Sequence, residues 1–376
     1  MSNKKVSNKN NRRKFLQYLG VGAASCTAVA CKDDTSSAST VEKKVSQETF
    51  NWKMVTTWPK NFPGLGTGAE YLAQIINEMS DGRLNIKVYG AGEIVPAFEI
   101  FDAVTAGTAE MGHGSAYYWK GKNPALQFFS TVPFGMTANE MNAWLYHGGG
   151  MELWEKAYKP FGLVPMAAGN TMVQMGGWFN KEINSVEDLQ GLKMRIPGLG
   201  GEVLRLAGGT PVNVPGGDLF VSLQKGVIDA TEWVGPYNDL AFGLHKAAKY
   251  YYSPGWHEPG TTLECFVNEQ AFNSLPNDLK SIVRNAARVA NQNMMLEYVA
   301  RNNDALVALV NEHKVDVREY PKDVIEKLRE LSAQVVADVV GSDPFAQEIY
   351  DSYQGFLAKS KAWYNLSERA YLNLRG

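Results

Sequence analysis

The stretch that decides the predicted fold is residues 184–197, which reads N-S-V-E-D-L-Q-G-L-K-M-R-I-P. Ser185 is suited to cap a helical turn, and the acidic residues after it lie in the positive field of the turn's amino end. Gly191 ends the turn, after which apolar and charged residues alternate as they do in a half-buried strand. The pattern therefore predicts a short turn followed by a strand that carries Arg195 near its carboxyl end.

Arg195 is a candidate ligand-binding residue because it lies near the carboxyl end of a predicted strand. Open α/β sheets bind ligands at the carboxyl ends of their strands, and a planar guanidinium can hold a carboxylate with two parallel hydrogen bonds. An arginine on the polar face of a strand is nevertheless solvated more often than functional. The segment I-D-A-T-E-W-V-G-P (228–236) favours the functional interpretation, since Glu232 and Trp233 end another short strand before a Gly-Pro stop.

These two segments resemble the solute-binding subunits of TRAP transporters. The run D-L-x-G-x-K-x-R-x-P (188–197) matches the one that carries the selectivity arginine of that family, and D-A-T-E-W-V-G-P (229–236) is similar to its branch that binds alpha-keto acids. Similar runs lie at 56–70, 110–124 and 253–260, so the resemblance covers about residues 50 to 370.

The resemblance implies an α/β protein with a two-lobed, periplasmic-binding-protein-like fold, crossing hinge strands and a long bracing helix. The weakly charged stretches 163–179 and 250–268 are the expected crossings, and apolar spacing predicts the long helix from Asp278 toward Val310. The expected divisions are 50–172 with 257–297 as lobe 1, 173–256 with 298–340 as lobe 2, and 341–376 as a carboxy-terminal helix. The keto-acid branch implies that this last helix is a candidate homodimer element.

The amino-terminal residues differ in charge from the rest of the chain. Residues 1–30 contain six basic residues and no acidic one, and N-R-R-K-F-L-Q (11–17) resembles a twin-arginine export signal. We expect 1–31 to be a removable export signal and 32–49 a flexible linker. Small residues before Cys31 and a Ser/Thr-rich tether after it favour a lipid anchor there, with a plain export signal as the alternative. The expected location is the periplasm, with or without attachment to the membrane.

Composition and motifs argue against several other functions. Without its signal the chain has 31 basic residues against 39 acidic ones, which disfavours nucleic-acid binding. The run G-L-G-T-G-A (64–69) is separated from the preceding strand by prolines, and no acidic residue closes the next strand, so a dinucleotide site is disfavoured. There is no G-x-S-x-G motif, and the five histidines lack metal-ligand spacing, which argues against a serine hydrolase and a zinc site.

The resemblance also implies a site in which a metal cation, Na⁺ or Ca²⁺, bridges substrate and protein. Such cations take oxygen ligands, here Glu232, the Gln174 amide and the Trp233 carbonyl. Glu258 lies near a further ligand position, with His257 as the alternative alignment, and a second acid there would favour calcium. The candidate substrate contacts are Arg195, Gln174, Trp233, Asn170, Tyr117 and Tyr118. Asn170 and Gln174 are isolated amides in an apolar stretch, so each could instead satisfy backbone groups.

The expected function is therefore that of a binding protein, not an enzyme. It would deliver a small 2-oxo or 2-hydroxy monocarboxylate, such as pyruvate, to the membrane subunits of a TRAP transporter. A dicarboxylate or a longer keto acid is the alternative within this class. An exported metal-dependent enzyme that acts on keto acids with Glu232 as base is a less favoured alternative. It needs a further general acid or base over the substrate, and His257-Glu258 is the one candidate constellation for that role.

Overall fold

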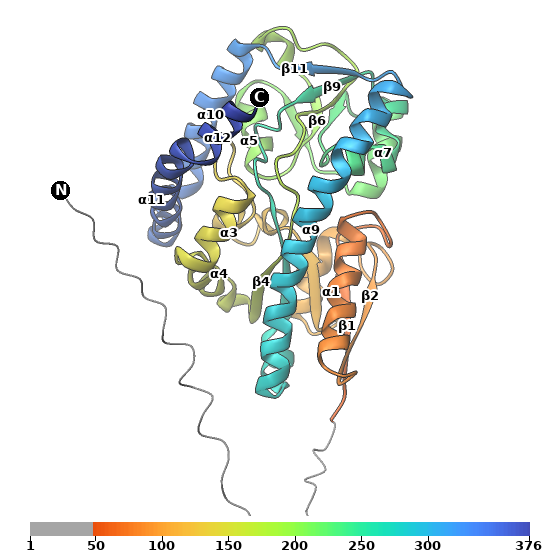
Figure 1. The fold of residues 1–376 in the computed structure, drawn as a ribbon, viewed down its shortest axis with the longest axis vertical. Helices are drawn as coiled ribbons and strands as arrows, with labels where there is room; N and C mark the ends of the chain where they lie inside the picture. Colours follow the sequence, from red (N-terminus) through yellow and green to blue (C-terminus); the bar gives the residue numbers. More distant parts are fainter. Residues whose placement is uncertain (1–47) are drawn as a thin grey trace, which may run out of the picture. The chain divides into compact units, whose positions relative to one another are not determined.

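The computed structural model describes residues 48–376 (Figure 1). The predicted export signal, Cys31 and most of the expected linker lie outside the described residues. The described chain forms two mixed β-sheets with helices packed around them, as expected for this α/β fold. No helix among the described residues is both long and apolar enough to span a membrane.

The first sheet has the strand order β2-β1-β3-β10-β4. Its core strands are parallel (β1 with β2 and β3), whereas β10 runs antiparallel to both β3 and β4. The strands are β1 (Phe50–Thr56), β2 (Leu84–Tyr89), β3 (Met111–Gly114), β4 (Leu163–Asn170) and β10 (Thr262–Asn268). Helices α1 (Leu65–Met79), α2 (Ile100–Thr105), α3 (Ala138–His147), α4 (Gly150–Tyr158) and α8 (Glu269–Ser274) belong to this part of the chain.

The second sheet has the order β11-β9-β5-β8-β6-β7. Its strands are β5 (Gly177–Phe179), β6 (Lys193–Arg195), β7 (Thr210–Val212), β8 (Ala230–Thr231), β9 (Tyr250–Ser253) and β11 (Asp316–Glu319). Its helices are α5 (Gly198–Leu206), α6 (Leu219–Gln224) and α7 (Pro236–Phe242). Because β6 lies between β7 and β8 and runs parallel to both, its carboxyl end meets theirs at one edge of the sheet.

The chain passes between the two sheets three times. Two connections are short, 171–176 and 254–261, and are called the crossing segments below; the third is the helical stretch 269–315, which leads from β10 to β11. The stretch 163–179 is therefore two strands and a turn, because Met172 adopts a left-handed conformation (φ 63°) after β4. The two crossing segments are bonded to each other through their backbones, from Thr171 N to Thr261 O at 3.0 Å and from Gln174 N to Glu258 O at 3.1 Å. Residues 171–176 and 254–261 are thus held together directly beside the site described below.

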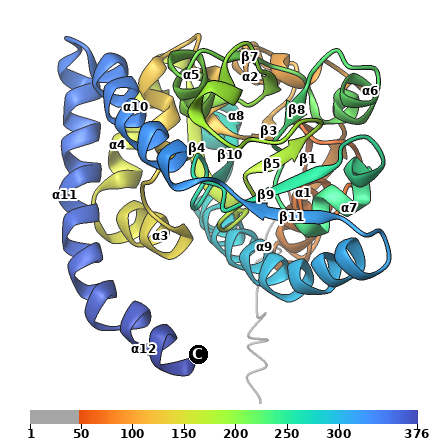
Figure 2. The same ribbon diagram turned by 90° about the horizontal axis from the view of Figure 1, so that it is seen from above.

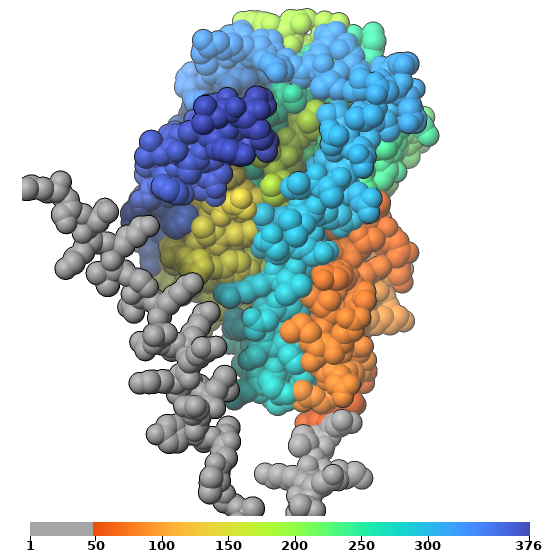
Figure 3. Space-filling view, in the orientation of Figure 1, coloured from red at the N-terminus to blue at the C-terminus, as the bar shows by residue number. Residues whose placement is uncertain are grey.

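The long helix α9 (Asn277–Asn311) was predicted within one residue at each end, and it packs against elements of both sheets. It contacts β4 and α1 of the first part and α7 of the second (Figures 1 and 2). Figure 3 shows it at the surface between the amino-terminal elements and α3–α4. Small buried side chains such as Ala286 and Ala290 let it lie close to the first sheet.

The glycine-rich run 64–69 forms the start of helix α1, with Gly64 at its cap and Leu65 as its first residue. A Cβ at Gly66 would lie 2.5 Å from the Pro59 carbonyl oxygen, so glycine permits this close approach. Strand β3 begins at Met111, because its pairing with β1 and β10 sets its register.

The carboxy-terminal part consists of α10 (Lys322–Val340), α11 (Pro344–Leu366) and α12 (Glu368–Arg375). The single helix expected after Asp343 is interrupted at Ser367, whose backbone is not helical (φ −107°, ψ −100°). Tyr353 on α11 is buried, and its hydroxyl accepts a hydrogen bond from Met136 N at 2.8 Å. The first half of α11 therefore belongs to the core through Ala346, Ile349 and Tyr353, whereas α12 has no buried residue.

Candidate functional site

The turn and strand that carry Arg195 are formed as the sequence predicted. Ser185 caps a short 3₁₀ turn, Val186–Leu189, and Asp188 reciprocates through its carboxylate in a capping box. Arg195 is the last residue of β6, and only 1% of its side chain is exposed. It does not lie on a solvated face, because Tyr118 of the 3₁₀ turn Ala116–Trp119 and the Trp233 ring contact its guanidinium.

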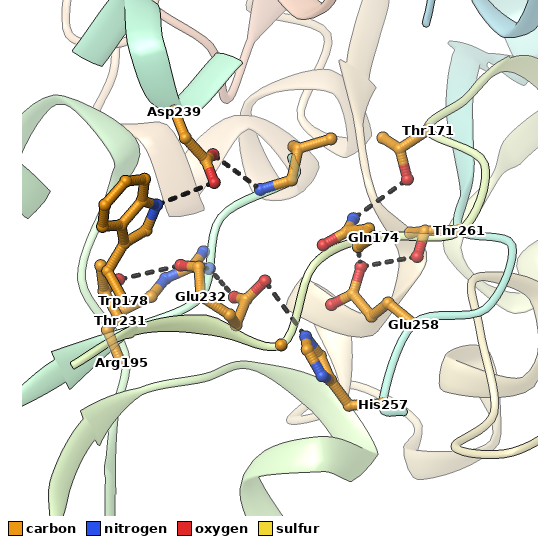
Figure 4. Close-up of polar contacts among 12 residues, drawn as sticks. Thr171, Gln174, Trp178, Arg195, Thr231, Glu232, Asp239, His257, Glu258 and Thr261 are labelled. Carbon is orange, nitrogen blue, oxygen red and sulfur yellow. Dashed lines mark hydrogen bonds and ion pairs between the residues drawn. The ribbon is translucent and has the colours of Figure 1, made fainter. Parts of the chain in front are cut away.

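Each nitrogen of the Arg195 guanidinium donates a hydrogen bond. Figure 4 shows its contact with Glu232. Its Nη1 donates to the carboxylate of Glu232, and its Nε donates to the Val214 carbonyl at 3.2 Å. Its Nη2 donates to the Tyr118 hydroxyl at 3.2 Å, and the Trp233 ring centroid lies 5.1 Å from the guanidinium carbon. Burial raises the pKa of Glu232 to about 7, although Arg195 opposes the shift. The pair holds one positive and one negative charge out of water.

A second polar group comes from the crossing segments. The Gln174 amide nitrogen donates to the Glu258 carboxylate at 2.7 Å and to the Thr171 hydroxyl at 3.0 Å. The Thr261 hydroxyl donates to the same Glu258 oxygen at 2.6 Å. Burial raises the pKa of Glu258 to about 7, and the nearby charge of Glu232 adds to this shift. Gln174 and Glu258 therefore form a preorganised acceptor-rich group opposite Arg195 and Glu232.

Several buried atoms in this region have no hydrogen-bond partner among the described residues. They include Glu232 Oε2 and Gln174 Oε1, which are oxygens, and both ring nitrogens of His257. Unpaired buried polar atoms are costly, so such a cluster indicates a ligand or ion. Two carboxylates and an amide oxygen are the donors that Na⁺ and Ca²⁺ take in proteins. The residues present thus fit the expected cation.

A small cavity lies beside this cluster, and of the described residues that form its wall Arg195 alone is basic. The lining residues are Trp58, Leu65, Tyr117, Tyr118, Thr171, Gln174, Arg195, Trp233, Val234, Thr261 and Leu263. Tyr117 and Tyr118 also line a surface groove with Pro197 and Gly198, so the two tyrosines border both the cavity and the outside. The wall combines one cationic group with aromatic and aliphatic surface, which suits a small anion.

The structure brings most of the predicted residues together. Arg195, Gln174, Trp233, Tyr117 and Tyr118 line the cavity, and Glu232 and Glu258 adjoin it. Asn170 is placed differently. Its amide donates to the Gly260 carbonyl at 3.2 Å and to Thr262 Oγ1 at 3.3 Å, and its oxygen accepts from Met172 N at 2.8 Å. These bonds tie the crossing segments together, which is the structural role that the sequence left open.

Sequence reasoning did not single out six cavity residues. Trp58 and Leu65 lie within the run 56–70, and Val234 lies within the run 229–236, so these motifs of the resemblance could have pointed to them. Thr171, Thr261 and Leu263 had no such signal, because they reach the cavity only through the pairing of the crossing segments.

Two further buried carboxylates hold residues next to the site in place through hydrogen bonds. Asp239 accepts from the Trp178 indole at 2.9 Å, from the Tyr251 hydroxyl at 2.7 Å and from Val234 N at 3.3 Å. Glu264 accepts from the Trp119 indole at 2.5 Å and from the Tyr158 hydroxyl at 2.6 Å. The first fixes the backbone next to Trp233, and the second fixes the residue next to Tyr118.

Comparison with known proteins agrees with this geometry. Residues 54–343 match the family model described as bacterial extracellular solute-binding protein, family 7. The chain belongs to this family of TRAP transporter solute-binding proteins. It is 41% identical to the monocarboxylate 2-oxoacid-binding periplasmic protein of Nostoc sp. PCC 7120 over 96% of this chain and 98% of that one.

Solved structures of the family give the same fold. A TRAP periplasmic solute-binding protein from Pseudoalteromonas atlantica, with bound sodium and pyruvate, is 44% identical with a TM-score of 0.84. One from Colwellia psychrerythraea, with bound calcium and pyruvate, is 46% identical with a TM-score of 0.84. Each comparison covers 87% of this chain and 99% of the other. The expected fold class and family are therefore confirmed.

The buried Glu264 predicts a pH dependence of stability. Burial raises its pKa to about 7 from 4.5, so the folded state holds the proton more tightly than the unfolded state. The free energy of unfolding should therefore fall as pH rises from about 4.5 to about 7, with Glu264 contributing roughly 1–3 kcal/mol. Glu264→Gln should make this fall smaller, measured by urea denaturation of ligand-free protein at several pH values. The exposed Glu319→Gln is the control, and an unchanged pH slope in Glu264→Gln would contradict the assignment.

Proposed function

We propose that this protein is the extracytoplasmic solute-binding subunit of a TRAP transporter and that it binds a small 2-oxo monocarboxylate, such as pyruvate, together with a metal cation. The observation that carries the proposal is the buried Arg195 beside a cluster of unpaired oxygen atoms from Glu232 and Gln174. The names of the Nostoc relative and of the two pyruvate-bound structures support the same ligand class. Membrane subunits of the transporter are the implied protein partners.

The charges of the site support a monoanion. Arg195 is the one basic side chain in the cavity wall, and a guanidinium matches a single carboxylate. Glu232, Gln174 and the Trp233 carbonyl, with Glu258, would hold the cation, which supplies positive charge for the ligand's carboxylate and keto oxygens. Buried charges need such pairing. A dicarboxylate would bring a second negative charge without a second basic partner in the wall.

The same residues support a role in binding rather than in chemistry. Glu232, the base that an enzyme would need, is paired with Arg195, and the relatives named above are solute-binding proteins. Recovery of unchanged ligand after prolonged incubation with the protein is the outcome we expect.

We also propose the two lobes that the sequence predicted. All strands of the first sheet lie in 50–172 and 257–297, and all strands of the second lie in 173–256 and 298–340. The two crossing segments join these parts, and the cavity draws residues from both, such as Trp58 and Arg195. Ligand would be held between the lobes, with α9 as the brace.

The test of the function is a thermal-shift screen of the mature protein after chelation of divalent ions. Pyruvate, lactate, longer 2-oxo acids and C4 dicarboxylates are added with sodium, with calcium and in buffer free of both. A ligand at a hundredfold excess over its dissociation constant stabilises the folded state by about 3 kcal/mol, which corresponds to roughly 5 °C. We expect pyruvate to give this shift only when a cation is present.

The matched variants are Arg195→Lys and the exposed Arg205→Lys. A single ammonium cannot reproduce the two-pronged contact, so Arg195→Lys should weaken pyruvate binding at least roughly tenfold, whereas Arg205→Lys should not. Near-normal affinity in Arg195→Lys, or a shift with dicarboxylates alone, would refute the assigned ligand.

We propose that the carboxy-terminal helices form a homodimer contact. Large apolar side chains are exposed there: Trp363 is 64% exposed, Leu366 79% and Leu374 85%. Such a patch on a soluble chain is typical of an interaction surface. Light scattering after size exclusion should give a dimer for the natural chain and a monomer for Leu366→Glu combined with Leu374→Glu. A monomeric natural chain would rule the contact out.

We propose that a twin-arginine signal exports the chain and that Cys31 carries a lipid anchor. The support is the N-R-R-K-F-L-Q run and the Ser/Thr-rich tether, both in residues 1–47 and thus outside the described part. Cys31→Ser should move the protein from the membrane fraction to the soluble periplasmic fraction, as followed by immunoblot. If the distribution of the protein between the two fractions did not change, the chain would be exported without a lipid anchor at Cys31.

A further inference from the structure

His257 lies beside the two carboxylates of the site. Glu232, His257 and Glu258 each offer one ligand atom, and these three atoms lie within 4.8 Å of one another. All three residues are buried. Glu232 follows β8 in the second sheet, whereas His257 and Glu258 lie in the crossing segment 254–261 (Figure 4). The group is therefore assembled by tertiary structure from two separate parts of the chain.

The imidazole of His257 has no hydrogen-bond partner on either nitrogen among the described residues. Its Nε2 lies 3.5 Å from Glu232 Oε2, which is too long for an ordinary hydrogen bond but close enough for both atoms to reach a common ion. The Trp256 ring packs edge-on against the imidazole, with 5.3 Å between the two ring centroids. Gly200 approaches His257 so closely that an added Cβ would lie 2.9 Å from the His257 Cβ.

A nitrogen donor changes the kind of cation that the group suits. Sodium and calcium take oxygen ligands, whereas imidazole nitrogen favours first-row divalent metals such as cobalt, nickel and zinc. One histidine with two carboxylates provides three protein ligands, a number that leaves coordination positions open for a bound ligand. No second histidine is needed, which is why the spacing of histidines along the sequence gave no indication of the site.

We propose that Glu232, His257 and Glu258 bind a divalent first-row transition-metal ion, with His257 as the nitrogen ligand. The inference deepens the proposed function, because it concerns the cation of the same site. It makes His257 a determinant of cation selectivity: the protein accepts sodium or calcium through oxygens and gains affinity for a transition metal through the imidazole.

The probe is Co²⁺ alone, added to the chelator-treated full chain in the absence of any organic acid. Nitrogen and oxygen coordination of Co²⁺ gives visible absorption bands, so binding and ligand type are read without a transport assay. The natural chain should show a saturable spectrum with one ion per chain. Zn²⁺ should displace Co²⁺ near equimolar amounts, whereas Ca²⁺ should require at least a hundredfold excess. If equimolar Ca²⁺ displaced Co²⁺ from the natural chain, the proposal would be overturned without any variant.

The matched variants are His257→Gln and His245→Gln. Glutamine keeps the length of the side chain but removes the imidazole, so the ratio of Co²⁺ to Ca²⁺ affinity should fall at least tenfold in His257→Gln. The His245 ring stacks on the His313 ring with 4.1 Å between their centroids, so this pair is the other histidine group that could bind Co²⁺. The spectrum should survive in His245→Gln. A spectrum that survives in His257→Gln, or that disappears in His245→Gln, would overturn the proposal.

The two proposals fail in different ways. If pyruvate binds with sodium or calcium but the Co²⁺ spectrum does not depend on His257, only the selectivity role is lost. If Co²⁺ binds through His257 but no 2-oxo acid stabilises the protein, the ligand assignment is lost and the metal site remains.

Discussion

The ion pair between Arg195 and Glu232 is the constraint on which the rest of the site depends. Both side chains are 1% exposed, so neither charge is stabilised by water. A buried pair gains stability only if the remaining donors and acceptors are satisfied. The Arg195 side of the pair meets this condition through Val214 and Tyr118, whereas one oxygen of Glu232 is left without a protein partner. This oxygen lies 3.5 Å from the Nε2 atom of His257.

The surroundings of this pair are rigid because neutral donors hold buried carboxylates in place. Asp239 joins β5, β9 and the backbone at Val234, and Glu264 joins the first sheet to Trp119 and Tyr158. Neither carboxylate has a basic partner among these contacts. They act as fixed acceptors that set the positions of Trp233 and Tyr118. Burial raises the pKa of both carboxyl groups, because their charged forms are poorly stabilised away from water.

The crossing segments connect the architecture with the chemistry. They are short and are bonded to each other through Thr171, Thr261, Gln174 and Glu258. These two short connections between the sheets thus carry the Gln174 amide, the Glu258 carboxylate and His257. A change in the angle between the sheets would move these groups relative to Arg195. Such a movement is needed if closure of the two lobes is coupled to ligand binding.

The sequence by itself determined the local elements, the family and most of the polar residues of the site. The cap at Ser185, the strand with Arg195 and the long helix α9 follow from residue spacing, which reflects contacts a few residues apart. Resemblance in short motifs then indicated Glu232, Gln174 and Glu258. Three features were decided only by the tertiary structure. Asn170 bonds the Gly260 carbonyl, Thr171 and Leu263 line the cavity, and His257 lies beside Glu232. The physical reason is that these contacts join residues far apart in the chain, and backbone pairing between the crossing segments, which local pattern does not encode, sets their distances.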